Sequence, residues 1–283
     1  MASRTLQGLA LCAGAGGLEL GLHIAEPGYR TVCYVEQEAY AAATLVARME
    51  DQALDTAPVW DDVKTFDGRP WRGKVDIVTA GYPCQPFSTA GKQLGEKDPR
   101  HIWPDIRRII KEIRPRYVFI ENVANHLRIG FFEVAGELRR LGYRSEAGLF
   151  TAREVGASHG RQRLFCVAHA DRIHVRLQSR PVRPQGRQRV LPKLKEPDAK
   201  NADQGGGAVG RGASRRRDIP LYAPGPGDLE TWRALIRLDP GLQPCLRRDD
   251  DGLAYRLDRN RLVGNGVSPL AAAYAWRTLS SKV

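Results

Sequence analysis

The sequence lacks several features that would assign the protein to a particular class. No run of about 18 or more apolar residues occurs in its 283 residues, so no transmembrane helix is predicted. The first five residues, Met-Ala-Ser-Arg-Thr, show no signal-peptide pattern, and we expect a soluble, cytoplasmic protein. The five cysteines have no paired Cys-x-x-Cys spacing, which argues against both a disulfide framework and a zinc site.

Acidic residues are also too few to balance the basic ones, and the formal net charge is +12. A polyanion is therefore the first partner to consider, because clustered Lys and Arg release counterions from phosphates on binding. Between Asp171 and Arg217 there are 13 Lys or Arg against 4 Asp or Glu, and no Phe, Trp or Tyr. Such a segment cannot bury enough apolar surface to fold alone, so we expect it to be flexible or ordered by nucleic acid.

Strands and helices alternate over the first 170 residues. This alternation predicts an open, largely parallel α/β sheet that is covered by helices on both faces. Strands are expected at 5–11, 31–35, 75–80, 117–122, 143–150 and 164–168, and helices near 18–24, 39–49, 102–113, 131–141 and 270–279. Ser268 and Pro269 are suited to cap and begin the last of these helices.

One cysteine, Cys84, stands between two prolines directly after the strand predicted at 75–80. Ligands bind at the carboxyl ends of strands in open α/β sheets, so this loop is well placed for chemistry. Pro83 and Pro86 restrict the backbone and make the loop stiff. Cys84 is either a reactive thiol or a small buried hydrophobic residue, and the loop alone favours neither interpretation.

A glycine-rich turn, Cys-Ala-Gly-Ala-Gly-Gly at 12–17, separates the first predicted strand from the first helix. Glycines allow a sharp turn and let a ligand approach N–H groups at a helix N-terminus. Glu36 ends the second strand about 20 residues later, where Rossmann-like folds place an acid that binds ribose hydroxyls. A further acid, Asp62, follows Val59-Trp60. Either acid alone would more simply be a solvated charge at a strand end.

Five short motifs resemble, in order, those of the DNA cytosine-5 methyltransferases. Any one of them is common by chance, whereas five in the same order at strand ends are not. They are the turn 12–17, Pro83-Cys84-Gln85, Glu121-Asn122-Val123, Arg161-Gln162-Arg163, and Gly264-Asn265 with Pro269. The stretch from 224 to 232 and Leu-Asp-Arg at 257–259 further resemble phage-type members. The resemblance implies a Rossmann-like, S-adenosylmethionine-dependent methyltransferase sheet with a small, irregular target-recognition region.

The same resemblance implies a catalytic set. Cys84 would add to carbon 6 of a flipped-out cytosine and so make carbon 5 reactive towards a methyl donor. Glu121, kept protonated by burial, would donate to ring nitrogen 3. Arg163 would hold the carbonyl oxygen of the base, and Arg161 would support that pocket or a phosphate. The two arginines alternate on a predicted strand and share one side of it, where they could also simply be solvated.

The methyl donor implied by the resemblance is S-adenosylmethionine. Its amino-acid part would lie near the glycines, its ribose on Glu36, its adenine amine near Asp62, and the C-terminal motif would close the pocket. The full set of expected contacts is Cys12, Gly14, Gly16, Gly17, Leu18, Glu36, Asp62, Val63, Asn265 and Gly266. Methyl transfer from a sulfonium requires no metal, and the sequence contains no cluster of metal-ligating residues.

The sequence departs from the family pattern at four positions. His159 stands where the family has Gln, and Ser158 where it usually has Pro. Cys12 replaces a usual Phe, and Tyr82 stands where many members have Pro, although the family tolerates an aromatic residue there. The geometry of the base pocket near His159 is therefore the least secure expectation.

Three regions are expected: a catalytic and cofactor-binding domain at 1–170, a basic and partly flexible target-recognition region at 171–255, and a segment at 256–283 that returns to the catalytic domain. Within the second region, a solvated linker is favoured for 196–214. We expect a monomer on duplex DNA, in the cytoplasm of a bacterium or a phage-infected host.

Three functions stay open. The first is an active DNA methyltransferase, either a phage enzyme or the modification half of a restriction pair. The second is a transfer-RNA cytosine-5 methyltransferase, although the Cys-Phe-Thr tripeptide typical of that branch is absent. The third is a catalytically silent DNA-binding protein. The presence of Cys84, Glu121 and both arginines argues against this last function, while His159 keeps it open.

Overall fold

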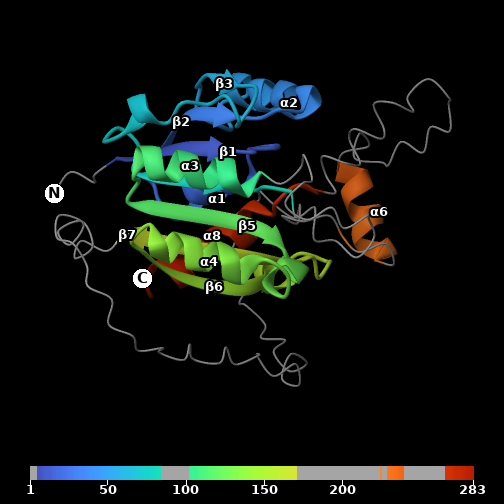
Figure 1. Ribbon diagram of the computed structural model, residues 1–283. Helices are drawn as coiled ribbons and strands as arrows, with labels where there is room; N and C mark the ends of the chain where they lie inside the picture. The colour runs from blue at the N-terminus through green and yellow to red at the C-terminus, as the bar shows by residue number, and fades with distance from the viewer. Residues whose placement is uncertain (1–4, 84–101, 171–223, 225–227, 239–264) are drawn as a thin grey trace, which may run out of the picture.

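The computed structural model describes residues 5–83, 102–170, 224, 228–238 and 265–283 (Figure 1). Cys84 and most of the expected recognition region lie outside these residues. The described part forms one seven-stranded sheet in the order β3-β2-β1-β4-β5-β7-β6. Its strands are β1 Leu6–Leu11, β2 Tyr29–Val35, β3 Val59–Trp60, β4 Ile77–Ala80, β5 Tyr117–Val123, β6 Tyr143–Thr151 and β7 Gln162–Ala170.

The first five strands are parallel to one another, and β7 runs antiparallel between β5 and β6. The expectation of a largely parallel α/β sheet is confirmed. The strand order reverses between β1 and β4, and this is the crevice where open α/β sheets bind ligands. The glycine turn leaves β1 and the loop that leads to Cys84 leaves β4, so both leave the sheet at this crevice.

Helices cover both faces of the sheet (Figure 1). The predicted helices are all present, each within two residues of its expected start and end. The helices are α1 Gly17–Ala25, α2 Ala39–Glu50, α3 Trp103–Ile113, α4 Phe131–Arg140, α6 Leu229–Leu238 and α8 Pro269–Ser280, with short 3-10 turns η1 Arg69–Trp71, η3 Ala124–Leu127 and η4 Arg153–Val155. The Ser268 side chain accepts a hydrogen bond from Ala271 N at 3.5 Å, which confirms the predicted cap of α8.

Side chains that alternate along the strands contribute to three hydrophobic clusters among the described residues, of which two include residues of β5. On β5, Val118 and Ile120 pack on one face, where α3 and α4 contribute residues such as Ile106 and Val134. Phe119 points to the other face and joins the residues of α1 and α8. This alternation is expected of strands that are buried on both faces, and it explains why their sequences are almost wholly apolar.

Helices α1 and α8 lie in close contact although they are far apart in the sequence. A Cβ atom added at Gly21 of α1 would lie only 2.6 Å from Ala272 Cβ and 2.8 Å from Pro269 O. The Trp276 indole nitrogen donates to the Glu26 carboxylate at 2.8 Å. The C-terminal helix therefore covers the helix that begins at the glycine turn.

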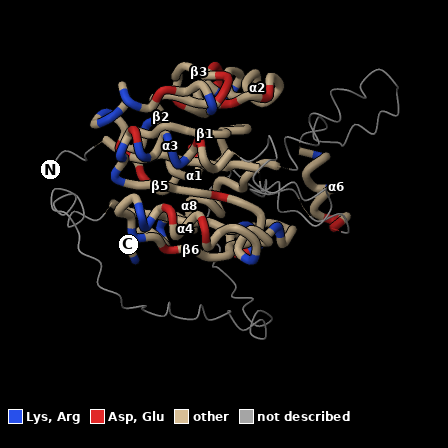
Figure 2. Tube along the Cα trace, in the orientation of Figure 1, with Lys and Arg blue, Asp and Glu red and all other residues tan. Residues whose placement is uncertain are grey.

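Basic and acidic residues are interspersed along the described elements (Figure 2). The segment from 171 to 217 carries a net charge of +9, out of +12 for the whole chain. Basic and acidic residues are therefore nearly equal in number over the rest of the chain. Among the described helices, none is long and apolar enough to cross a membrane.

Candidate active site

Glu121 lies near the end of β5 and is almost fully buried, with 6% of its surface exposed. Its Oε1 forms an ion pair with Arg163 Nε on the neighbouring strand β7, at 2.9 Å. Burial raises the Glu121 pKa to about 7, although Arg163 and Arg161 both act to lower it. A carboxyl group in this state exchanges its proton near neutral pH, as a general acid requires.

Asn122, the next residue, fixes the loop that leaves β4. Its Nδ2 donates to Tyr82 O at 3.0 Å, and its Oδ1 accepts from Val123 N at 2.8 Å. A Cβ atom at Gly81 would lie 3.7 Å from Glu121 Oε2. The chain therefore passes directly beside the Glu121 carboxylate three residues before Cys84.

A second contact, which sequence reasoning did not predict, holds the same loop. Tyr82 is buried, and its hydroxyl lies 2.9 Å from His126 Nε2. His126 Nδ1 lies 2.9 Å from Ile129 O, and because a carbonyl only accepts, Nδ1 carries the proton and Nε2 accepts from Tyr82. Burial lowers the His126 pKa and favours this neutral form. The only sequence signal was the Tyr at position 82 in place of Pro.

Arg161 and Arg163 both act on Glu121, but they have different direct partners. The Arg161 Nη2 donates to Gly266 O at 2.6 Å and so joins the strand β7 to the segment before α8. The Cβ of a residue at position 17 would lie 2.7 Å from Val267 O, which brings the same segment against the glycine turn. His159 is exposed in the loop that precedes β7.

The glycine turn and Glu36 meet at the ends of β1 and β2. Gly14 N donates to Glu36 Oε2 at 2.7 Å, and Glu38 N donates to Oε1 at 2.8 Å. Gly14 has a φ of +56°, and no heavy atom lies within 4 Å of the position where its Cβ would be. Gly16 differs, because a Cβ there would lie 2.5 Å from Leu54 Cδ1. Gly14 thus borders open space, whereas Gly16 has a φ of +75° that favours glycine and packs against the end of the Leu54 side chain.

The other expected cofactor residues lie around this turn in different environments. Asp62 follows β3 beside the end of β2, where Glu36 N donates to Trp60 O at 2.9 Å. Asp62 is half-buried, and the side chains of Val63 and Leu18 are buried in the core. Cys12 is half-buried with a φ of +51°, and Asn265 is exposed.

No group of three or more His, Cys, Asp or Glu side chains within the described residues could hold a metal ion. The polar groups at this edge of the sheet include one buried acid with two arginines and an amide around β5, and a glycine turn with further carboxylates after β2 and β3. This set suits proton transfer and hydrogen bonding to an organic substrate.

A family model described as C-5 cytosine-specific DNA methylase matches residues 6–206. The chain belongs to the C-5 cytosine-specific DNA methylase family. Among curated members, it is 37% identical over 164 residues to the Type II methyltransferase M.NgoMIV of Neisseria gonorrhoeae, which covers 56% of this chain and 50% of that protein. It is 44% identical over 122 residues to M.PspPI of a Psychrobacter strain, covering 43% and 28% respectively.

The chain therefore spans half or less of the length of these curated family members. Among solved structures, a DNMT2 mutant from Spodoptera frugiperda superposes with a TM-score of 0.51 at 20% identity, over 60% of this chain and 51% of that one. The methyltransferase EhMeth of Entamoeba histolytica gives a TM-score of 0.50 at 15% identity, over 59% and 54%. These two likenesses establish the fold.

Proposed function

We propose that this chain is a DNA cytosine-5 methyltransferase. It would transfer a methyl group from S-adenosylmethionine to carbon 5 of a flipped-out cytosine in duplex DNA, with Cys84 as the nucleophile. The observation that carries the proposal is that Asn122 holds the loop that leads to Cys84, and that the Glu121 carboxylate, paired with Arg163, lies beside the same loop. Family membership supports the same chemistry, and Type II relatives favour a restriction-modification or phage setting in the bacterial cytoplasm.

The residues around the glycine turn fit S-adenosylmethionine. Gly14 borders open space at the N-terminal side of α1, where backbone N–H groups are oriented towards a ligand. The Glu36 carboxylate accepts two backbone hydrogen bonds and has acceptor capacity left for ribose hydroxyls. Asp62 would accept from the adenine amine, while Asn265 and Gly266 would close the pocket from the C-terminal side. When bound, the donor supplies an electrophilic methyl group on a sulfonium.

Cys84 and Glu121 would act together on the base. The Cys84 thiolate forms a bond to carbon 6, and the displaced electron pair moves through the ring to nitrogen 3, which takes the proton of Glu121. A Glu121 pKa of about 7 leaves the acid partly protonated at neutral pH. Carbon 5 would then take the methyl group, with S-adenosylhomocysteine as the leaving group. Nitrogen 3 would return its proton to Glu121, and loss of the carbon 5 proton to solvent would restore the ring and expel Cys84 as a thiolate.

Arg163 and Arg161 would have separate roles. Arg163 contacts Glu121 and would donate to the carbonyl oxygen of the base, which also brings positive charge near the ring. Arg161 would support the pocket indirectly, since its hydrogen bond to Gly266 O fixes the segment on which Asn265 lies.

The target-recognition role falls to the basic region at 171–255, within a catalytic part at 1–170 and 256–283. A cytosine inside a duplex cannot present carbons 5 and 6 to a thiol and a methyl donor, and flipping it costs a few kcal/mol. Arginine contacts to phosphates would position the DNA, and a few contacts to guanine edges would select the site. We propose that one copy of the chain acts on one site.

The proposal is tested by incubating the protein with tritiated S-adenosylmethionine and either unmethylated duplex DNA or transfer RNA. We expect label in DNA, and its loss in Cys84→Ser, because a hydroxyl is a far weaker nucleophile than a thiolate at neutral pH. Cys33→Ala removes a buried thiol from β2, outside the proposed site, and serves as the matched control, with retained activity expected.

The other outcomes separate the remaining functions. Label in transfer RNA alone would identify an RNA methyltransferase, and binding to DNA without label in either substrate would identify a silent member of the family. DNA that contains 5-fluorocytosine should trap an SDS-stable adduct with the wild-type protein. If Cys84→Ser formed the same adduct, the nucleophile would have to be another residue.

A further inference from the structure

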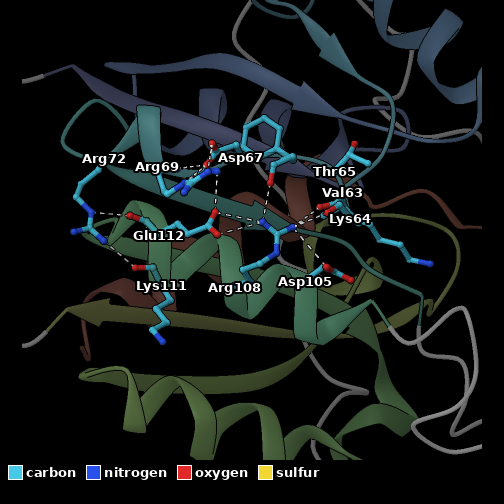
Figure 3. A network of polar contacts seen from close by, with 12 residues as sticks. Val63, Lys64, Thr65, Asp67, Arg69, Arg72, Asp105, Arg108, Lys111 and Glu112 are labelled. Atoms are coloured by element: carbon cyan, nitrogen blue, oxygen red, sulfur yellow. Dashed lines mark hydrogen bonds and ion pairs between the residues drawn. The ribbon is translucent and has the colours of Figure 1, made fainter.

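Arg108, on α3, contacts the turn that follows β3 through three backbone carbonyl groups (Figure 3). Its Nη1 donates to Phe66 O at 2.8 Å, and its Nη2 donates to Val63 O at 3.0 Å and Lys64 O at 3.1 Å. The planar guanidinium offers five donors in a fixed arrangement, and a lysine ammonium cannot reproduce this geometry. One side chain therefore fixes the backbone of the whole turn.

Two carboxylates on α3 hold this guanidinium in place. Glu112 lies 3.3 Å from Arg108 Nη1, and Asp105 lies 3.5 Å from Nη2. Glu112 also accepts a hydrogen bond from Gly68 N at 2.9 Å, so it contacts the same loop directly. Partly exposed ion pairs contribute little stability by themselves, and the main effect of these pairs is to orient the Arg108 donors.

The loop that follows β3 also donates hydrogen bonds to α3. Arg72 Nε donates to Glu112 O at 2.7 Å, and its Nη2 donates to Lys111 O at 3.2 Å, at the C-terminal end of α3 (Figure 3). The side chains of Val63 and Phe66 are buried in the core beside α3. The turn thus has an apolar anchor towards the core and a polar anchor on Arg108.

The turn determines where the Asp62 carboxylate lies. Asp62 Oδ1 accepts from Lys64 N at 2.9 Å, and Asp62 O accepts from Phe66 N at 3.2 Å. These bonds span the same residues whose carbonyl groups Arg108 binds. A change in the position of Lys64 or Phe66 would therefore rotate the carboxylate that faces the cofactor under the proposed function.

We propose that Arg108 is a positioning residue for the adenine side of the S-adenosylmethionine pocket. It contacts neither the reacting atoms nor the base, and it acts through the Asp62–Val63 turn. This inference rests on the proposed function, because it takes Asp62 to be the acceptor for the adenine amine.

The test measures binding of S-adenosylhomocysteine by calorimetry, and steady-state methylation, for wild type and Arg108→Gln. We expect binding to weaken about tenfold and the KM for S-adenosylmethionine to rise by a similar factor, with kcat within about twofold. Arg108→Lys should give an intermediate affinity, because its ammonium reaches fewer carbonyl groups. Arg107→Gln is the matched control, since Arg107 is on the same helix but pairs with Glu137 of α4 at 2.7 Å.

A ligand without the adenine amine separates positioning from general destabilisation. The analogue of S-adenosylhomocysteine that carries unsubstituted purine in place of adenine has no N–H donor to offer Asp62, so the affinity ratio between wild type and Arg108→Gln should shrink towards one. An equal loss of affinity for both ligands in Arg108→Gln would overturn the inference. Unchanged binding of S-adenosylhomocysteine in both Arg108→Gln and Arg108→Lys would also overturn it. A wild-type protein that binds S-adenosylhomocysteine without methylating nucleic acid would refute only the proposed reaction. A wild-type protein that binds no S-adenosylhomocysteine would refute both.

Discussion

The environment of Glu121 prepares its carboxyl group for proton transfer, and the burial that does so lowers the free energy of unfolding. Water is largely excluded from its carboxylate, and the guanidinium groups of Arg163, in direct contact, and Arg161 offset part of the lost solvation. A pKa of about 7 is the net result, since burial outweighs both neighbouring arginines. The ionised form is thus poorly solvated in the folded protein, and this links the chemistry of the site to stability.

Glu121→Gln should therefore change the pH dependence of unfolding. Between an ordinary pKa of 4.5 and a folded pKa of about 7, the unfolded chain releases the proton of Glu121 while the folded protein keeps it. The unfolded state then binds fewer protons, so the free energy of unfolding falls as pH rises through this window, by on the order of 3 kcal/mol. Gln does not titrate, so in urea unfolding from about pH 5 to pH 8 the free energy of unfolding should fall further in wild type than in Glu121→Gln, by this amount.

Glu19 provides the internal control for that experiment. Burial raises its pKa to about 7 as well, but it is present in both proteins and its contribution cancels in the difference. If the free energy of unfolding fell equally with pH in wild type and Glu121→Gln, the fold would not raise the Glu121 pKa.

At the level of single residues, the sequence placed Glu121 and Arg163 in one site through the resemblance to DNA cytosine-5 methyltransferases, and the structure shows these two side chains in contact. How the surrounding groups are connected was less predictable. The bond from Asn122 to Tyr82 O and the contact between Tyr82 and His126 were not predictable, because they depend on the path of a loop in three dimensions. The contacts of Arg108 were not predictable either. Its three acceptors are backbone carbonyl oxygens, which every residue has, so the sequence does not reveal which of them it contacts.

At the level of elements, α1 and α8 pack against each other and together cover one face of the sheet. Gly21 permits this contact, because its missing side chain makes room for Ala272 and for the first turn of α8. The helix itself would be more stable with alanine at this position, by roughly 1 kcal/mol. Packing between helices and intrinsic helix propensity therefore favour opposite residues at position 21.

Gly21→Ala tests which effect is larger. A Cβ atom 2.8 Å from the backbone oxygen of Pro269 cannot be accommodated by a side-chain rotation, so the helices must separate. Overpacking of this kind costs about 1–3 kcal/mol, which exceeds the gain in propensity, and we expect a lower midpoint in thermal unfolding.

Gly136→Ala in α4 is the matched control. The nearest atom to its added Cβ is Arg140 Nη2 at 3.9 Å, an ordinary contact, so only the propensity gain applies and the midpoint should rise slightly. A stabilised Gly21→Ala protein would show that α8 can move away from α1 without cost.

Most element boundaries were predictable from periodicity, and the exceptions have physical reasons. β3 has two residues and forms too short a pattern to be recognised, although it closes one edge of the sheet. β7 extends two residues beyond the apolar run at each end, because its pairing with β5 and β6 continues through Arg163 and His169. Hydrogen bonding to neighbours, rather than side-chain pattern, sets the length of such a strand.

At the level of the whole molecule, charge is distributed unevenly along the chain. The segment from 171 to 217 carries a net +9, whereas the described elements have interspersed charges (Figure 2). Binding to DNA should accordingly depend strongly on salt, because each phosphate that the protein neutralises releases counterions.

Replacing Arg216 and Arg217 by Gln should weaken binding of unmethylated duplex DNA about equally for all sequences. The slope of log affinity against log salt concentration should fall by about 0.9 for each phosphate that the variant no longer neutralises, as measured by fluorescence anisotropy. Arg139→Gln with Arg140→Gln is the matched pair, since these residues end α4 at the edge of the sheet opposite the site. Equal slopes for the two double variants would show that the basic segment does not bind phosphates.

The contact between α1 and α8 also determines when the protein can complete its fold during synthesis. The hydrogen bond from Trp276 to Glu26 joins residues 250 positions apart, and contacts of such long range form late. The apolar surface of α1 that α8 covers must stay exposed on the ribosome until residues 269–280 have been made. During that interval chaperones and neighbouring nascent chains compete for this surface, so the yield of folded protein depends on how quickly translation reaches the last helix.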